Sequence, residues 1–197
     1  MKKCVVICSF FLAMCKFSIA QNDIGFAITT NLLNLPLKGP SLNIEKSIGK
    51  RGSINFYFSK GKFGEKIFLN YDSYHFQTLL LEYRLYESGT FSRNQKLEGF
   101  YIGFYAKHMN RELYRIALND GGRYGLFATT NRDFKGQSLG SGFSLGGQKV
   151  FSKKIMIGVF SGIGAAGYIK EFDADNIGRK VNWHPDLRFG LQVGIKF

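Results

Sequence analysis

Apolar and polar residues alternate with a period of two along most of the chain after residue 20, the pattern of β-strands with one face in an apolar environment. The last segment is the clearest, because six apolar residues from Leu187 to Phe197 alternate with polar or small ones. The pattern therefore predicts an all-β chain of eight antiparallel strands. The seven earlier segments lie within residues 23–33, 41–48, 54–59, 78–85, 100–107, 139–148 and 155–166.

The connections between these segments differ in length on the two sides of the predicted sheet. If the first strand runs outward from the periplasm, two of the three inner turns are tight and three of the four outer loops are long and polar. An even number of strands with short periplasmic turns and long external loops is typical of outer-membrane barrels. Within the third outer loop, residues 112–118 have apolar positions at helical spacing, which indicates a short helix. The inner turns are 49–52, 87–96 and 152–154, and the outer loops are 35–39, about 60–73, about 109–137 and about 171–184.

The two faces of the predicted strands carry different residues. One face is nearly free of charge, as a lipid-facing band requires, since a cation at the bilayer midplane costs about 2–4 kcal/mol. Its exceptions, Lys46, His75 and Gln77, fall near strand ends. The other face carries mainly Gly, Ser, Asn, Gln and Tyr rather than the Lys-rich and Glu-rich mixture of a solvated strand. We therefore predict an eight-stranded up-and-down transmembrane β-barrel with its apolar face outward.

The interior of an eight-stranded barrel is only wide enough for side chains. Glycines on the inner faces of the last three strands should therefore make room for larger residues, such as Tyr101 and Tyr105. Charged groups in such an interior must be paired, because isolated buried charges are prohibitively unstable. We predict a structural network of lumen charges that joins Glu45, Glu82 and Asp186 to Arg84, Lys107, Arg188 and Lys196.

The first twenty residues have the features of a cleavable secretory signal. Lys2 and Lys3 precede a short apolar run, and Ser18-Ile19-Ala20 is a small-x-small cleavage site. We therefore divide the chain into a signal peptide, residues 1–20, and one outer-membrane barrel domain, residues 21–197.

The cysteines leave a second interpretation of this leader open. Cys15 follows a short apolar run, as in a lipoprotein signal, although Met14 is larger than the residue expected before a lipidated cysteine. Cleavage after Ala20 would remove all three cysteines, at positions 4, 8 and 15. The exported domain must then be held together without disulfides, which a closed hydrogen-bonded sheet can do.

The chain is strongly basic. Its formal net charge is +13, and the three lysines of the leader account for three of these charges, so residues 21–197 carry +10. A basic protein outside the cytoplasm meets anionic lipid and lipopolysaccharide phosphate before it meets nucleic acid. We therefore expect outer-membrane lipid and lipopolysaccharide as partners, no nucleic acid, and a monomer.

Several short motifs resemble those of one family. They are Thr30-Asn31-Leu32-Leu33, Leu42-Asn43-Ile44-Glu45, Leu81-Glu82-Tyr83-Arg84, Gly99-Phe100-Tyr101-Ile102-Gly103 and Gly146-Gly147-Gln148. Together with the closing run to Phe197, they resemble a Bacteroidota family of unknown function, regarded as small outer-membrane β-barrels of the OmpA/OmpX-like type. The resemblance implies a Gram-negative outer membrane and supplies no activity. Independently, Phe197 after alternating apolar residues resembles the C-terminal signal read by the barrel-assembly machinery.

Two motifs have a possible ligand chemistry. Residues 162–167 form a G-x-G-x-x-G pattern, but the helix and the later acidic residue of a dinucleotide site do not follow. Residues 173–178 resemble the start of a calcium loop, yet its twelfth position is His184 rather than the closing Glu. We interpret them as strand glycines and a solvated loop, and predict no cofactor and no metal site.

Catalysis by a lipid-modifying barrel would need a serine nucleophile with a histidine base. None of His75, His108 and His184 has the His-x-Ser spacing of barrel-type lipid A deacylases, although long-range pairs remain open. We therefore predict a non-enzymatic barrel with a structural or surface-interaction role and no catalytic residues. The alternatives are an exported soluble barrel that binds an apolar ligand, with its apolar face inward, and a lipid A-modifying barrel enzyme.

Overall fold

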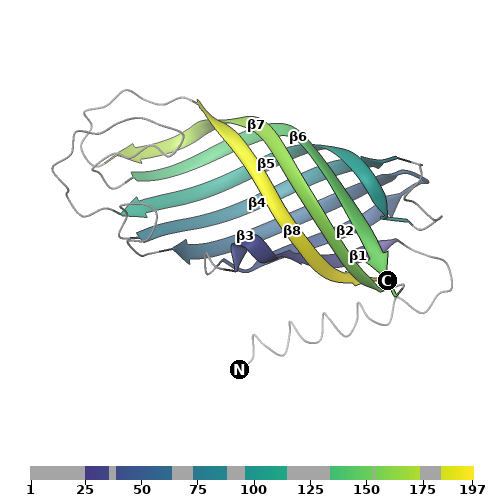
Figure 1. The fold of residues 1–197 in the computed structure, drawn as a ribbon. Helices are drawn as coiled ribbons and strands as arrows, with labels where there is room; N and C mark the ends of the chain where they lie inside the picture. Colours follow the sequence, from purple (N-terminus) through teal and green to yellow (C-terminus); the bar gives the residue numbers. More distant parts are fainter. Residues whose placement is uncertain are drawn as a thin grey trace, which may run out of the picture.

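Eight antiparallel strands close into a barrel in chain order (Figure 1). The predicted signal peptide with Cys15 and Ala20, and the calcium-like loop beyond Asp173, lie outside the described residues. The computed structural model describes residues 25–35, 39–63, 73–87, 96–114, 134–152, 154–173 and 183–197. The strands are β1 (Phe26–Asn31), β2 (Ser41–Ile48), β3 (Gly52–Phe63), β4 (Ser73–Tyr86), β5 (Gly99–Tyr114), β6 (Phe134–Phe151), β7 (Ile155–Asp173) and β8 (Trp183–Lys196), with a 3-10 helix, η2 (Leu32–Asn34), after β1.

The first and last strands pair with each other and close the sheet. Ala27–Asn31 of β1 pair with Gln192–Lys196 of β8. Closure pairs the backbone groups that an open sheet leaves exposed at its two edges, which explains how a domain without cysteines is held together. The predicted all-β, eight-stranded antiparallel fold is confirmed.

Strands β5, β6 and β7 are longer than the alternation predicts. They have 16, 18 and 19 residues, whereas a tilted strand crosses a bilayer in about 9–11. Glu112 pairs with His75 of β4 and with Lys135 of β6, so the third outer loop is shorter than 109–137. The helix suggested for residues 112–118 is wrong for residues 112–114, which are strand, and its remainder lies outside the described residues.

The barrel has two unlike ends. At the turn end, residues 49–51 connect β2 to β3 with Gly49 at φ +66°, and Phe197 lies against Phe26 with ring centroids 5.9 Å apart. The Phe197 N–H donates to the Phe26 carbonyl at 2.7 Å. The other end, which we call the loop end, is where β3 finishes and β4 begins. The two described ends of the chain therefore meet at the turn end.

The wall is less complete between β8 and the short β1. Because β1 ends at Asn31, residues 183–190 of β8 pair only with β7 among the described residues. Pro185 lies in this stretch, and proline is tolerated at a sheet edge because it has no N–H to donate. The Asn31 side chain caps η2 by accepting from Leu33 N–H at 3.2 Å, and it also accepts from Leu191 N–H at 3.1 Å. Asn31 therefore joins η2 to β8.

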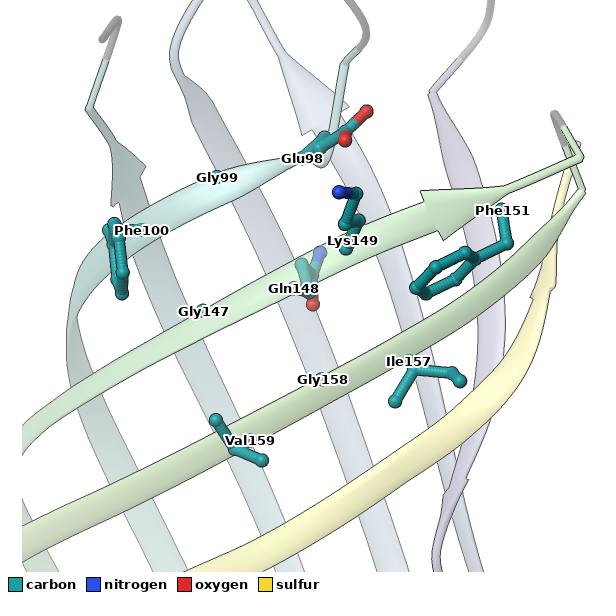
Figure 2. Close-up of a pocket in the computed structure, with 10 residues that line it drawn as sticks. All are labelled: Glu98, Gly99, Phe100, Gly147, Gln148, Lys149, Phe151, Ile157, Gly158 and Val159. Atoms are coloured by element: carbon teal, nitrogen blue, oxygen red, sulfur yellow. The ribbon is translucent and has the colours of Figure 1, made fainter. Parts of the chain in front are cut away.

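The apolar face of the strands points outward, as the alternation predicts. Leu81 and Ile163 are 54% and 65% exposed, whereas Glu82 and Tyr105 are 1% and 0% exposed. Figure 2 shows part of this outer face near the turn end, with Phe100 on β5 and Val159 on β7. The barrel is therefore apolar outside and largely polar inside.

Candidate functional site: the charged lumen

The inner face of β4 carries two charges two positions apart. Glu82 and Arg84 both point inward because the side-chain period of a strand is two. The partner strands supply the groups around them: Glu45 comes from β2, Asn55 from β3 and Ser144 from β6. The sheet therefore gathers residues from four strands at one place in the lumen.

Arg84 is the centre of this first cluster. Its Nη1 donates to Glu45 Oε2 at 2.8 Å, and its Nη2 and Nε donate to Glu82 Oε2 at 2.8 and 2.9 Å. Its Cζ lies 4.4 Å from the centroid of the Tyr101 ring. A planar guanidinium can bridge two carboxylates and stack on an aromatic ring at once, which a lysine cannot do.

The two carboxylates have further partners. Glu45 accepts from Ser53 and Tyr86 through Oε1, and from Gln148 through Oε2 at 3.2 Å. Glu82 accepts from Asn55 at 3.0 Å and also from the Ser144 hydroxyl. A buried ion pair is stable only when such additional hydrogen bonds satisfy the remaining lone pairs.

A second cluster lies on β5 and β8. Lys107 donates to Asp186, and Tyr105 donates to the same carboxylate at 2.9 Å. Arg188 stacks over the Tyr105 ring at 4.5 Å, and its Nη1 lies 3.7 Å from Glu82 Oε1. Arg188 therefore connects the second cluster to the first.

Six of the seven residues proposed for the lumen network are brought together in these two clusters. The seventh, Lys196, is buried near the turn end, where its backbone N–H donates to the Lys154 carbonyl at 2.7 Å. It lies on the level of Glu45, because Ala27 of β1 pairs with both residues. The two clusters balance in charge, because three carboxylates face three cations.

Glycines make room for the lumen tyrosines, as predicted. A Cβ at Gly146 would meet the Tyr101 ring, and a Cβ at Gly142 or Gly164 would meet the Tyr105 hydroxyl. Gly164 belongs to the G-x-G-x-x-G pattern, which lies wholly within β7, and residues 168–173 after it continue the same strand. The strand interpretation of these glycines is confirmed.

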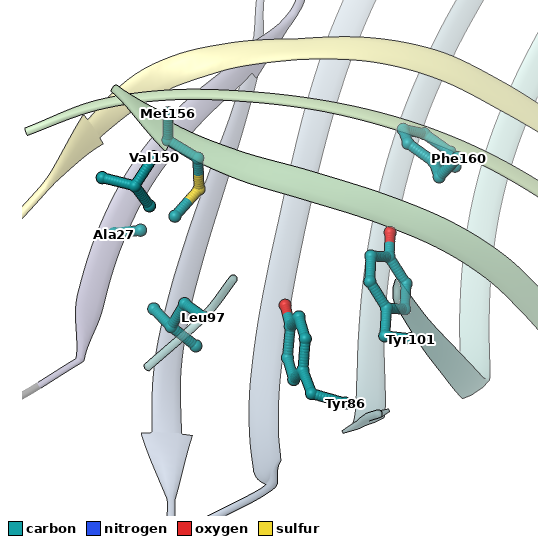
Figure 3. Packing of buried hydrophobic residues seen from close by; sticks show 7 residues of the cluster. All are labelled: Ala27, Tyr86, Leu97, Tyr101, Val150, Met156 and Phe160. Atoms are coloured by element: carbon teal, nitrogen blue, oxygen red, sulfur yellow. The ribbon is translucent and has the colours of Figure 1, made fainter. Parts of the chain in front are cut away.

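An apolar cluster lies inside the turn end of the barrel (Figure 3). Tyr86, Tyr101 and Phe160 point into it from the wall, and Leu97 enters from the segment before β5. Leu97 is 3% exposed with φ +62°, and its carbonyl accepts from Gln148 Nε2 at 2.9 Å. The alternation does not identify Leu97, because it lies outside the alternating segments. Its burial is a property of the closed barrel.

The family of the chain follows from comparison with protein-family models. Residues 6–191 match the family described as "Protein of unknown function (DUF3575)". The chain belongs to this family. No curated protein matches it in sequence. Among solved structures, the crystal structure of CarO from Acinetobacter baumannii is similar at 12% identity and a TM-score of 0.42, covering 90% of this chain and 100% of that one.

Two of the three histidines have contacts with residues other than serine. His75 Nδ1 lies 3.9 Å from Glu112, and the His184 ring packs 5.0 Å from the Tyr168 ring. The described residues hold no group of three or more side chains that could bind a metal ion. No helix among them is long and apolar enough to span a membrane. Chemically, the described lumen contains two linked clusters of ion pairs that connect β2, β4, β5 and β8.

Proposed function

We propose that this protein is a non-enzymatic outer-membrane β-barrel with a structural or surface-interaction role. This proposal rests on which face of the strands points outward and which face points into the lumen. Large apolar side chains point outward around the wall, while the ion pairs of Glu45, Glu82 and Asp186 lie inside. A soluble barrel would have the opposite arrangement, because contiguous exposed apolar surface is unfavourable in water.

The distribution of aromatic residues supports a membrane position. Trp183 is 66% exposed toward the loop end, and Phe151 and Phe197 are 44% and 42% exposed at the turn end. Outer-membrane barrels carry an apolar band with aromatic residues at both interfaces. Residues between these ends, such as Phe143 and Ile163, would then face lipid acyl chains.

The lumen supports a structural role rather than transport. The ion-pair clusters connect β2, β4, β5 and β8 through the barrel interior, and the apolar cluster around Leu97 fills its turn end. Eight-stranded barrels have interiors that side chains fill. We therefore propose that the loops are the sites of interaction. Their partners would be lipopolysaccharide phosphates near them and other molecules of the envelope.

The alternatives are less well supported. A soluble barrel that carries an apolar ligand needs an apolar interior, and Glu45, Glu82 and Arg84 occupy this one. A lipid A-modifying enzyme needs a serine beside a histidine, whereas His75 lies beside Glu112 and His184 packs against Tyr168. We further propose cleavage near Ala20, assembly by the barrel-assembly machinery through Phe197, and a monomer in the outer membrane of a Gram-negative cell.

Membrane fractionation tests the proposal. The full chain should be found in the outer-membrane fraction, resist extraction by urea, and change its gel mobility when boiled, because a closed barrel stays folded in cold detergent. Recovery as a soluble periplasmic protein would overturn the proposal. Lipid A analysed by mass spectrometry should be the same with and without the gene, and a change in its acylation would favour the enzyme.

A further inference from the structure

A groove of about 300 Å³ lies on the outer face of β5, β6 and β7 near the turn end (Figure 2). It exists because Gly147 presents no side chain at an outward position between Leu145 and Lys149. A Cβ at Gly147 would lie 3.2 Å from the Phe100 ring, so a side chain at this position would narrow the groove. Its apolar walls are Phe100, Phe151, Ile157 and Val159.

Two opposite charges line this groove beside Gly147. Lys149 and Glu98 both belong to its lining, and Figure 2 shows Lys149 between Gly147 and Phe151 on β6, with Glu98 on the neighbouring segment before β5. Lys149 is exposed, with its Nζ 5.8 Å from the Phe151 ring centroid, whereas Glu98 is 8% exposed. Neither residue takes part in an ion pair within the described part of the chain. The groove therefore combines apolar walls with one cation and one anion in its lining.

We propose that the groove binds one glycerophospholipid with a primary-amine headgroup. One acyl chain lies over Gly147, the phosphate pairs with Lys149, and the ammonium pairs with Glu98. This inference rests on the proposed outer-membrane location, in which the turn end faces the periplasm and the ligand comes from the inner leaflet. Lipid tails are as apolar as leucine, so the acyl chain fills the groove while the headgroup charges select the lipid.

Three variants separate these contributions. Gly147→Leu fills the groove, Lys149→Gln removes the phosphate partner, and Glu98→Gln removes the ammonium partner. Two matched controls leave the groove untouched. Lys46→Gln removes another exposed outward cation near the turn end, and Ser141→Leu adds a leucine to the outward face of the same strand.

The measurement is native mass spectrometry of the delipidated, detergent-folded full chain. It is titrated with phosphatidylethanolamine, phosphatidylglycerol or phosphatidylcholine of identical acyl chains. The unmodified protein should bind one phosphatidylethanolamine more tightly than the other two lipids. Lys149→Gln should weaken all three by about fivefold, the equivalent of ~1 kcal/mol for one cation at a membrane surface. Glu98→Gln should abolish the preference for phosphatidylethanolamine over phosphatidylglycerol, and Gly147→Leu should weaken every lipid equally.

The controls should bind lipid as the unmodified protein does. If Lys46→Gln and Ser141→Leu lost as much lipid affinity as the groove variants, the proposed lipid site would be overturned. The absence of any one-to-one lipid binding would overturn it as well. Each sample is checked for its heat-modifiable gel shift, and Gly147→Ala replaces the leucine variant if that one fails to fold. A protein that is found in the outer membrane but binds no lipid rejects only this inference. A chain that stays soluble rejects the proposed function itself.

Discussion

Arg84 Nη1 lies 2.8 Å from Glu45 Oε2 across the lumen, although the two residues are 39 positions apart in sequence. The same guanidinium holds Glu82, its neighbour two positions back on β4. One side chain therefore neutralises two buried carboxylates from different strands. Removing it would leave both without their main cation.

Arg84→Met should lower the free energy of unfolding by about 3–5 kcal/mol, because breaking a buried ion pair leaves an uncompensated charge. Urea unfolding in lipid vesicles, followed by tryptophan fluorescence of Trp183, measures the change. Arg51→Met is the control, since Arg51 is exposed in the turn between β2 and β3. If both variants unfold at the same urea concentration, the Arg84 cluster does not stabilise the barrel.

Lys107 and Asp186 should be energetically coupled, because each is the other's ion-pair partner between β5 and β8. A double-mutant cycle of Lys107→Met and Asp186→Asn should give a coupling energy of about 0.5–3 kcal/mol. Tyr105→Phe removes the other donor to Asp186 and should cost about 1 kcal/mol by itself. Strict additivity of the Lys107 and Asp186 substitutions would show that the pair contributes nothing.

The cost of enlarging Gly146 should depend on the size of the side chain at position 101. Gly146→Ala should destabilise the barrel by about 1–3 kcal/mol, because the added Cβ would overlap the Tyr101 ring and overpacking strains a lumen. In a Tyr101→Leu background the same substitution should cost much less. The unfolding midpoint with and without Gly146→Ala is measured in each background. An equal loss of stability in both would point to backbone strain instead of a clash with Tyr101.

The assignment of faces could be predicted from the sequence, whereas the contacts between residues could not. A period of two decides which side of the sheet Tyr101, Glu82 and Leu81 occupy, whatever their partners are. Which carboxylate Arg84 reaches depends on strand register and on side-chain length, which alternation does not contain. Lys196 shares the inward face with Asp186, but it lies much further along β8, so it is at the turn end and away from that carboxylate.

The alternation pattern also does not show where several elements begin and end. Residues 109–114 have no clean alternation, yet cross-strand pairing with β4 and β6 keeps them in β5. Leu97 follows a segment that the pattern predicts as a polar turn, and it is buried because the closed barrel offers an apolar space at its turn end. These features arise from tertiary packing, and the alternation of single strands does not record them.

Phe197 should matter more for assembly in the cell than for stability in detergent. Phe197→Gln removes the terminal aromatic and its contact with Phe26, so refolded protein should lose about 1 kcal/mol or less. If the barrel-assembly machinery reads Phe197, as we propose, the yield of this variant in the outer membrane should fall severalfold. The control is Phe151→Gln, which changes an exposed aromatic residue at the same end of the barrel. An equal loss of yield in this control would assign the effect to aromatic residues at the membrane interface rather than to a C-terminal assembly signal.

If lipid surrounds the barrel, the free-energy cost of placing a charge on the outward face should depend on its depth in the bilayer. Leu81 lies in the middle of the outward row of β4, between Leu79 and Tyr83, whereas Phe151 lies at the turn-end rim. In lipid vesicles, Leu81→Arg should cost about 2–4 kcal/mol and Phe151→Arg only about 0–1 kcal/mol. Both are measured by urea unfolding against Leu81→Gln, which changes polarity without adding a charge. A barrel surrounded by water would accept an arginine equally well at either position, because neither cation would be removed from solvent. Equal costs would therefore contradict the membrane location that the apolar outer face supports.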